Sequence, residues 1–473
     1  MKNKSVKSRS KMFSMFAVAL MMLMAFAVAV PVQESDADAS SYYRYEITYS
    51  GESISKVEVY TSSTATSPSK TITDARNSFW NFGSDGYGPF NSCYAAVDST
   101  GAIAFHLNPN NLKQKLDGSS FTTSDYNIVW LIPTVYWNVS GSKLILCSES
   151  SAGGTAWAHT FADSSTPRKY IGIGVYEASL ATFGGASNSL MSQTGVAPQV
   201  STNIVNFDTY AHNTPGNTML WNFYQWTLTK MATYMVGMGK NTQQIWGDGN
   251  VSSGSRQNNG LGDTTGPYMP LRSTSNTTTY SKVFIENSWG NVREFVGDVV
   301  FNSYALWVGN NVSGCTYTAT AGKTNSGLSI PSDGWITGTD KTDQYWDFPT
   351  SSSSTGNSSN TSYPGDYVYQ NSGVRVLNVG GNYNNDTKAG VAYTNGNNNS
   401  TNNNSNLGAR LDCASKLFVI LRPVQPANSM REINLATWQK TTTNARHSAR
   451  NWGKLIRDIS AGERRNEVNT PMV

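Results

Sequence analysis

The residues of this chain with the most distinctive chemistry are asparagines. Twelve of the thirty-five positions from Val376 to Arg410 are Asn, and Tyr383 and Tyr393 lie among them. An Asn side chain both donates and accepts hydrogen bonds, while Tyr provides a large contact area with few rotatable bonds. This composition is typical of adaptable binding loops, so the stretch indicates a binding surface rather than a catalytic centre.

The two halves of this stretch differ in composition. The first half mixes Tyr, Asp, Lys and Asn, whereas residues 397–406 are almost purely Asn, Ser and Thr. We therefore expect ligand contact in the first half and support of the loop in the second. The predicted ligand-binding residues are Asn378, Asn382, Tyr383, Asn384, Asn385, Asp386, Lys388, Tyr393 and Asn395. If both tyrosines are exposed contacts, replacing them with Ala removes binding and leaves stability little changed; the alternative is a polar surface loop without a partner.

The remaining polar residues form no recognisable catalytic or metal-binding pattern. Asp248 and Asp263 lie in glycine-rich turns, where turn formation is a commoner role than calcium binding. Glu286, Glu294 and Asp298 resemble paired carboxylates but fit better as hydrogen-bonding residues of a hairpin. The histidines lie far apart without metal-ligand spacing: His106, His159, His212 and His447. We therefore expect no enzymatic activity, no cofactor and no metal.

Four cysteines, Cys93, Cys147, Cys315 and Cys413, are widely separated and match no metal-binding spacing. In an exported protein they allow one or two disulfides, and buried free thiols are an equal alternative.

Strand-like sequence bounds the Asn-rich stretch on both sides. VRVLNV precedes it at residues 374–379, and KLFVILRPV follows it at residues 416–424. A disordered polar tract normally continues into linker on both sides, because it has no apolar surface to bury. We therefore expect a folded domain to hold the stretch, with Gly380 and Gly381 turning the chain at its start.

Upstream, residues 42–115 alternate short β-type runs with Gly- and Pro-containing turns, which predicts an antiparallel meander. Residues 217–236 break this pattern with apolar residues at three- and four-residue spacing, an Asn at the start and Gly237 at the end. This segment predicts an amphipathic helix that packs on the sheet. Residues 247–270 form a long glycine-rich connection, and residues 350–362 form a polar insertion.

The N-terminus has the three parts of a secretory signal. Five cations in the first eleven residues precede an uncharged run from Met12 to Val32, and Ala37-Asp38-Ala39 offers a cleavage site. Residues 1–39 are therefore either a cleaved signal peptide or an uncleaved membrane anchor. Both readings place the rest of the chain outside the cytoplasm, secreted or at the cell surface.

The net charge of +4 does not indicate a nucleic-acid partner. Residues 40–424 hold 22 Lys and Arg against 24 Asp and Glu, while eight cations lie in the basic tail of unknown role at residues 425–473. Nucleic-acid binding requires a concentrated basic face, which the body of this chain lacks.

Three segments together resemble a known family. They are LWNFYQWTLTKMATYMV (residues 220–236), ENSWGNVREFVGD (residues 286–298) and RVLNVGGNYNN (residues 375–385), the last closing with NLGARL (residues 406–411). They resemble the formylglycine-generating-enzyme branch of the C-type lectin fold, which has motifs like GNVWEWV and RVxRGGSW. Within it the likeness is greatest to the variable proteins of diversity-generating retroelements.

The resemblance covers residues 120–424 and implies an α+β fold class. It implies a β-rich region at residues 40–118, then a C-type-lectin-like domain at residues 119–424 of the formylglycine-generating-enzyme subtype, with a variable-type segment at residues 376–410. Arg293 stands where the family has an aromatic residue, and Asn378 replaces the second Arg of RVxR. No cysteine occupies the position of the oxidase centre, and the sugar and calcium signatures of ordinary C-type lectins are absent.

The resemblance also implies a reason for the asparagines. Variable proteins of this kind use AAC-like codons at exposed positions, and changes at the adenines give Asn, Tyr, Asp, Ser or Gly. We therefore expect an exported, adhesin-like ligand-binding protein that recognises a protein or glycan on another cell, a host or a phage. The alternatives are an exported oxidase of the formylglycine-generating type and a structural surface protein without a specific ligand.

Overall fold

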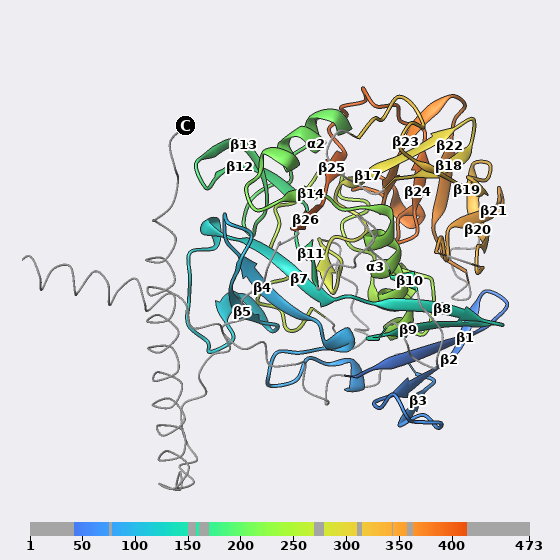
Figure 1. Ribbon diagram of the computed structural model, residues 1–473. Coiled ribbons are helices and arrows are strands. Elements are labelled where there is room, and N and C mark those ends of the chain that lie inside the picture. The colour runs from blue at the N-terminus through green and yellow to red at the C-terminus, as the bar shows by residue number, and fades with distance from the viewer. Residues whose placement is uncertain are drawn as a thin grey trace, which may run out of the picture. The chain divides into compact units, whose positions relative to one another are not determined.

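The computed structural model describes residues 42–74, 78–149, 158–159, 170–268, 279–309, 315–342, 344–356 and 363–413 (Figure 1). These residues belong to one unit of the chain, which extends to Ile420. The predicted signal segment, the basic tail and most of the second half of the polar insertion lie outside the described residues. None of the described helices is long and apolar enough to cross a membrane.

Three sheets contain most of the strands. The six-stranded sheet has the order β10 (Ala158–His159), β8 (Tyr136–Ser140), β9 (Lys143–Cys147), β1 (Arg44–Ser50), β2 (Ser53–Tyr60) and β3 (Lys70–Ile72). The seven-stranded sheet has the order β14 (Thr218–Leu220), β26 (Leu411–Cys413), β11 (Tyr170–Gly174), β7 (Asn127–Pro133), β4 (Cys93–Val97), β5 (Ile103–Asn108) and β6 (Asn111–Lys115).

The nine-stranded sheet carries the Asn-rich stretch. Its order is β19 (Thr324–Ser329), β18 (Ala305–Val308), β17 (Arg293–Asn302), β23 (Val374–Val379), β24 (Thr394–Gly396), β22 (Tyr367–Gln370), β20 (Gly334–Thr339) and β21 (Pro349–Ser353), and β25 (Leu407–Ala409) also pairs with β17. Two small hairpins complete the strands: β12 (Ala178–Phe183) with β13 (Ala186–Ser192), and β15 (Lys282–Val283) with β16 (Ile285–Glu286).

The α+β fold class expected from the resemblance is wrong. In the described part of the chain, twenty-six strands accompany only three α-helices, α2 (Ile204–Asn213), α3 (Phe223–Gly237) and α4 (Thr242–Trp246), so the protein is mainly β-sheet. The resemblance rested on three short segments, and each of them specifies only local structure. The turn-rich, alternating sequence between these segments forms short strands instead of helices.

The predicted antiparallel meander near the N-terminus is confirmed by the pairing of β1 with β2 and of β4 with β5. These strands do not form a sheet of their own. β1 also pairs with β9, and β4 also pairs with β7, so strands on both sides of residues 118 and 119 share the same two sheets.

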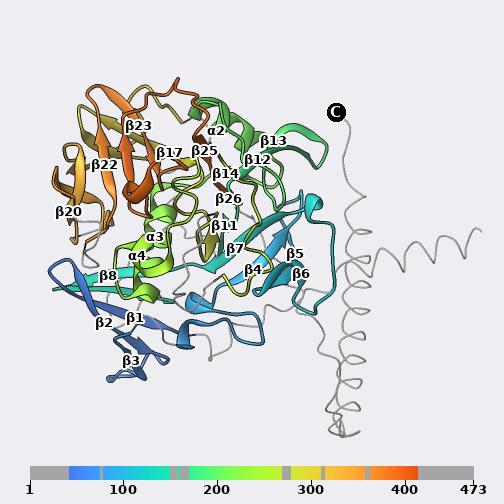
Figure 2. The same cartoon turned by 180° about the vertical axis from the view of Figure 1, so that it is seen from behind.

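The predicted helix is confirmed as α3, but it begins later than expected. Asn222 caps it by accepting from the Gln225 backbone N–H at 3.0 Å, and the Gln225 side chain accepts from the Asn222 N–H at 2.9 Å. The helix is buried on all sides rather than amphipathic, because it lies between the six-stranded and nine-stranded sheets in both ribbon views (Figures 1 and 2). Its Lys230 is fully buried and donates to the Asp347 carbonyl at 2.8 Å.

The nine-stranded sheet separates two hydrophobic clusters. Leu377 and Val379 of β23 pack with Trp226 of α3 in the larger cluster, while Val376 packs in a second cluster with Phe295 of β17. Side chains alternate between the two faces of a strand. Asn378 therefore points to the face opposite Leu377 and Val379.

Candidate functional site

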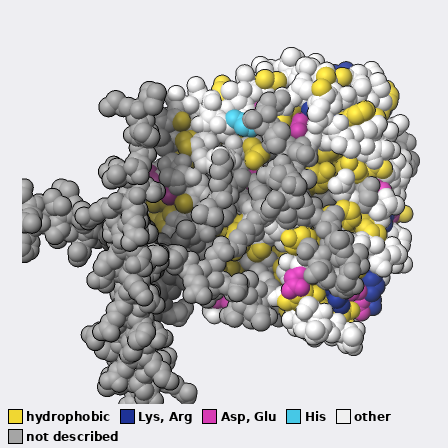
Figure 3. All heavy atoms as spheres, viewed as in Figure 1, with side chains coloured by type: hydrophobic (Ala, Val, Ile, Leu, Met, Phe, Trp, Pro, Cys, Tyr) yellow, Lys and Arg dark blue, Asp and Glu magenta, His cyan; other side chains and the backbone are white. Residues whose placement is uncertain are grey.

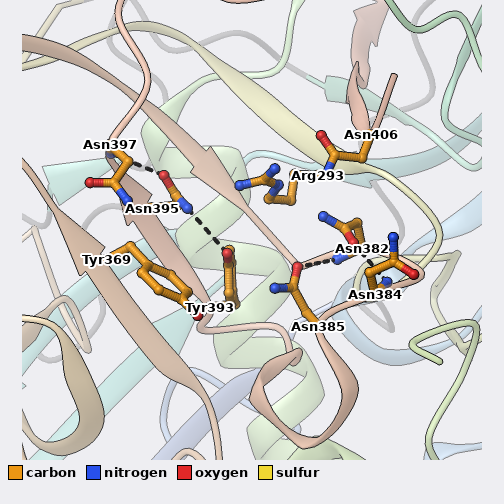
Figure 4. A pocket seen from close by; sticks show the side chains of 9 residues that line it. All are labelled: Arg293, Tyr369, Asn382, Asn384, Asn385, Tyr393, Asn395, Asn397 and Asn406. Carbon is orange, nitrogen blue, oxygen red and sulfur yellow. Dashed lines mark hydrogen bonds between the residues drawn. The ribbon is translucent and has the colours of Figure 1, made fainter. Parts of the chain in front are cut away.

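The Asn-rich stretch lines a pocket of about 300 Å³ on the nine-stranded sheet. Figure 4 shows the side chains converging from separate strands and loops. The lining residues are Arg293, Tyr369, Asn382, Asn384, Asn385, Tyr393, Asn395, Asn397 and Asn406. Seven of these nine come from residues 376–410.

Strand pairing places the floor of the pocket on one face of the sheet. Tyr369 lies opposite Asn395, Asn395 lies opposite Asn378, and Asn378 lies opposite Phe295. Residues that are directly paired point to the same face. Arg293, two residues before Phe295 on β17, therefore shares this face with Tyr369 and Asn395.

Gly380 and Gly381 turn the chain from β23 into the loop beside the pocket, as predicted. Both have positive φ, +84° and +78°, which favours glycine. A Cβ on Gly381 would lie 2.7 Å from the Ala389 Cβ, and one on Gly380 would lie 3.0 Å from the Ser288 carbonyl oxygen. The chain therefore packs closely against Ser288 at Gly380 and against the return segment of the loop at Gly381, which disfavours a side chain at either position.

Asparagine side chains hold the loops that they come from. The Asn385 side chain accepts from the Asn382 N–H at 2.8 Å, and the Asn382 side chain accepts from the Asn384 N–H at 2.7 Å. Asn395 accepts from the Asn397 N–H at 3.0 Å. Because these bonds use the amide oxygen, the NH₂ groups of Asn382 and Asn385 have no partner in the described part of the protein and remain available to a ligand.

Residues of α3, α4 and the glycine-rich connection form hydrogen bonds with the backbone of the loop. The Trp226 indole of α3 donates to the Val391 carbonyl at 2.9 Å, and the Gln243 amide of α4 donates to the Ala389 carbonyl at 2.6 Å. The glycine-rich connection contributes as well, since the Asp386 N–H donates to the Val251 carbonyl at 2.9 Å. The backbone of the pocket is therefore fixed independently of most side chains that line it.

Arg410 anchors the end of the stretch. Its guanidinium is fully buried and bonds both oxygens of Glu294, at 3.1 and 2.9 Å from Nε. It also donates to the carbonyls of Gly174, Val175 and Glu286. Glu294 thus acts structurally, as predicted for the hairpin carboxylates.

Among the described residues, Arg293 is the only charged side chain that lines the pocket. It is half-buried, its Nε has no hydrogen-bond partner, and it forms no ion pair with any carboxylate of the described residues. Burial raises the pKa of Tyr393, and the Arg293 charge together with a hydrogen bond from the Arg293 side chain opposes that rise, so the guanidinium contacts the Tyr393 hydroxyl. The pocket therefore has positive character without an internal counter-charge.

A row of aromatic side chains leads away from the pocket. Ring centroids are 6.0 Å apart between Tyr393 and Tyr369, and 4.6 Å apart between Tyr369 and Tyr367. Lys388 lies over the Tyr367 ring at 4.6 Å and donates to the Tyr369 hydroxyl at 3.0 Å. Its charge is therefore engaged beside the pocket.

Of the nine predicted binding residues, five line the pocket: Asn382, Asn384, Asn385, Tyr393 and Asn395. Asn378 is buried beside Asn395, its partner on β24, while Asp386 is exposed and Lys388 half-buried outside the lining. Tyr383 is 9% exposed, so it is not the open aromatic contact that we expected. Tyr393 is fully buried apart from its contact with the pocket, so its replacement with Ala is expected to affect stability.

Sequence reasoning missed four of the lining residues. Asn397 and Asn406 come from the half that we assigned to support alone. Tyr369 lies outside the Asn-rich stretch, in the segment YVYQ. The alternation of residue types in that segment predicts a strand but does not indicate which face of the strand lies at the site. The sequence feature that could have pointed to Arg293 is that it stands where the family motif has an aromatic residue.

The other candidate groups lie away from the pocket. All four cysteines are free, and burial raises the pKa of Cys93 to about 12. Asp263 is buried and accepts from the Tyr268 hydroxyl at 2.8 Å and the Thr194 hydroxyl at 2.5 Å, which is a structural role. Among the described residues, no group of three His, Cys, Asp or Glu side chains is arranged to hold a metal ion.

Comparison with known proteins gives little further information. No family model and no curated protein matches this chain. The Major Tropism Determinant U1 variant is similar over 80% of this chain and 84% of its own, with 13% identity and a TM-score of 0.25. The I1 variant is similar over 80% and 73%, with 13% identity and a TM-score of 0.23. Likenesses this weak support no conclusion about fold or function.

Proposed function

We propose that this protein is an exported, non-enzymatic binding protein that recognises a partner on another cell, a host or a phage through the Asn-lined pocket. We further propose that residues 376–410 are the diversified segment of a diversity-generating retroelement target. The observation that carries this proposal is that seven of the nine lining residues come from that segment, and all seven are Asn or Tyr.

The architecture of the site suits sequence diversification. Backbone groups hold the loop, as in the bonds to the Val391, Ala389 and Asp386 backbones, and these do not depend on the identity of the lining side chains. A rigid backbone limits the entropy lost on binding. Replacement of an exposed side chain such as Asn384 therefore changes the recognised partner and has little effect on the stability of the fold.

The surface over this sheet carries few charged side chains around the pocket. In Figure 3 the region at upper right, over the nine-stranded sheet, is mostly uncharged, with few Lys, Arg, Asp or Glu side chains in view. Protein recognition sites are commonly depleted in charge at their centre.

The genomic test is a search beside the gene for a reverse transcriptase and a near-repeat of the sequence encoding residues 376–410. We expect the two copies to differ at adenines of codons for lining residues such as Asn382, Asn384 and Asn397. A repeat that differs equally at codons for anchoring residues such as Gly381 and Arg410 would contradict the proposal.

The binding test compares cell or phage-surface extracts bound by the exported chain and by an Asn382→Ala, Asn384→Ala, Asn385→Ala triple variant. We expect the variant to remain folded and to lose the partner. Because Asn382 and Asn385 also hold the loop, Asn384→Ala alone serves as the variant with the least structural effect. Retention of saturable binding by both variants would place the binding surface elsewhere.

A further inference from the structure

The Arg293 guanidinium lies in the pocket without a counter-ion. It differs in this from Arg410, which lies between β25 and β26 and is surrounded by Glu294 and three carbonyl groups. Arg293 is half-buried, and a charge that is partly shielded from water pairs more strongly with an opposite charge than one at an open surface does. No carboxylate of the described residues forms an ion pair with Arg293. An anionic group of a ligand would therefore supply the missing counter-ion.

Two further residues at the site bury polar atoms without partners in the described part of the protein. Both the Nδ2 and the Oδ1 of Asn378 lack a hydrogen bond, as does the Oδ1 of Asn406. Asn378 is fully buried and shares the pocket face with Asn395. Buried polar groups normally have partners, so these unpaired atoms make the sheet beside the pocket polar, although Asn378 itself does not line the pocket.

The neutral part of the lining suits a sugar ring. The free amide NH₂ groups of Asn382 and Asn385 donate to hydroxyl oxygens, and the exposed Asn384 side chain accepts from hydroxyl hydrogens. The half-buried ring of Tyr369 provides an apolar wall. A volume of about 300 Å³ is at the lower end for small-molecule sites, and a flat protein epitope would leave such a hollow unfilled.

We propose that the pocket binds a carboxylate-bearing sugar residue, such as a uronic or sialic acid, with its carboxylate on Arg293 and its hydroxyls on the surrounding amides. This assignment rests on the binding function proposed above and names its ligand class. Arg is suited to this role because its planar guanidinium matches a carboxylate with two parallel hydrogen bonds.

The test is a calorimetric or ligand-observed NMR titration of the exported chain with sodium glucuronate and N-acetylneuraminate. Glucose and methyl glucuronate are the uncharged counterparts, and glutarate carries carboxylates without a sugar ring. We expect the acidic sugars to bind and the other three compounds to bind at least about tenfold more weakly.

Arg293→Gln is expected to weaken binding of the acidic sugars by about tenfold to a hundredfold and to leave glucose unaffected. The matched control is Arg375→Gln, because Arg375 is a half-buried arginine on β23 of the same sheet that does not line the pocket. Thermal unfolding of both variants verifies that they fold.

The proposal would be overturned if wild type and Arg293→Gln bound glucuronate with equal affinity. It would also be overturned if wild type bound glucose as tightly as glucuronate, or glutarate as tightly as glucuronate; the latter result would identify a simple anion site. Failure of every sugar to bind would also overturn it. If an Asn384-dependent partner still binds in that case, the general binding function stands and only the sugar assignment falls.

Discussion

At the scale of single residues, the asparagines have two roles. Asn382, Asn385 and Asn395 each accept a backbone N–H from a residue two or three positions away, so they build the loops as well as line the pocket. Such bonds are a general reason for Asn in turns. The high Asn content therefore reflects loop construction and display together.

The two roles predict different effects of substitution on stability. Tyr393→Ala is expected to lower the free energy of unfolding by about 3–5 kcal/mol, because it removes a buried aromatic ring. Asn384→Ala is expected to change it by less than about 0.5 kcal/mol, since Asn384 is exposed. Urea denaturation measures both; similar values for the two variants would show that Tyr393 is not part of the core.

At the scale of elements, the Asn-rich segment is held at both ends. Gly380 and Gly381 begin it by packing against Ser288 and Ala389, and Arg410 ends it by bonding Glu294. Between these points β24 pairs with both β23 and β22. This arrangement explains how a polar, Asn-rich segment remains folded without a core of its own.

Arg410→Met is expected to destabilise the protein by about 3–5 kcal/mol, because it leaves Glu294 buried without its cation. The Glu294→Met, Arg410→Met double variant should recover part of this loss, since both charges are removed. Chemical denaturation distinguishes these cases. A double variant no more stable than the single one would mean that the carbonyl contacts of Arg410 dominate.

Gly381→Ala is expected to destabilise the protein more than Gly373→Ala. Both glycines have similar positive φ, +78° and +80°, so both substitutions carry the same backbone strain of about 1–2 kcal/mol. Only the Cβ at residue 381 meets another atom, the Ala389 Cβ at 2.7 Å. The difference between the two thermal midpoints therefore reports the close packing of the loop, and equal midpoints would contradict it.

At the scale of the whole molecule, buried ionisable groups couple stability to pH. Asp366 is fully buried and accepts from the Ala392 N–H at 2.7 Å, beside the pocket-bearing strand β24. Burial raises its pKa to about 8, although the nearby Lys230 charge and the backbone hydrogen bonds oppose the rise. The folded protein therefore keeps a proton on Asp366 that the unfolded chain, with a pKa of about 3.9, releases.

This proton makes stability fall as pH rises from about 4 to about 8, because unfolding then releases it. Asp366→Asn carries no such proton, so the variant should lose less stability than wild type between pH 5 and pH 8, by at most about 4 kcal/mol. Denaturation at the two pH values measures the difference. An identical loss in both proteins would show that Asp366 is ionised when folded.

Parts of the fold followed from local sequence. Short alternating runs predicted the N-terminal strands, and the Asn222 region with Gly237 predicted α3, since capping and periodicity are local properties. The position of the cap was missed because residues 218–220 pair with β26, a contact distant in sequence. The expected amphipathicity of α3 was wrong for the same reason, because sheets on both sides bury it.

The sequence by itself determined that residues 376–410 form an Asn- and Tyr-rich segment that Gly380 and Gly381 turn near its start, since these properties depend on residue type and order. Only the tertiary structure decided which side chains meet in a pocket. Arg293 and Tyr369 join the asparagines through strand pairings of β17, β22, β23 and β24. Pairing between strands distant in sequence is set by the packing of the whole chain, so no local pattern could place Arg293 beside Asn395, or bury Tyr393.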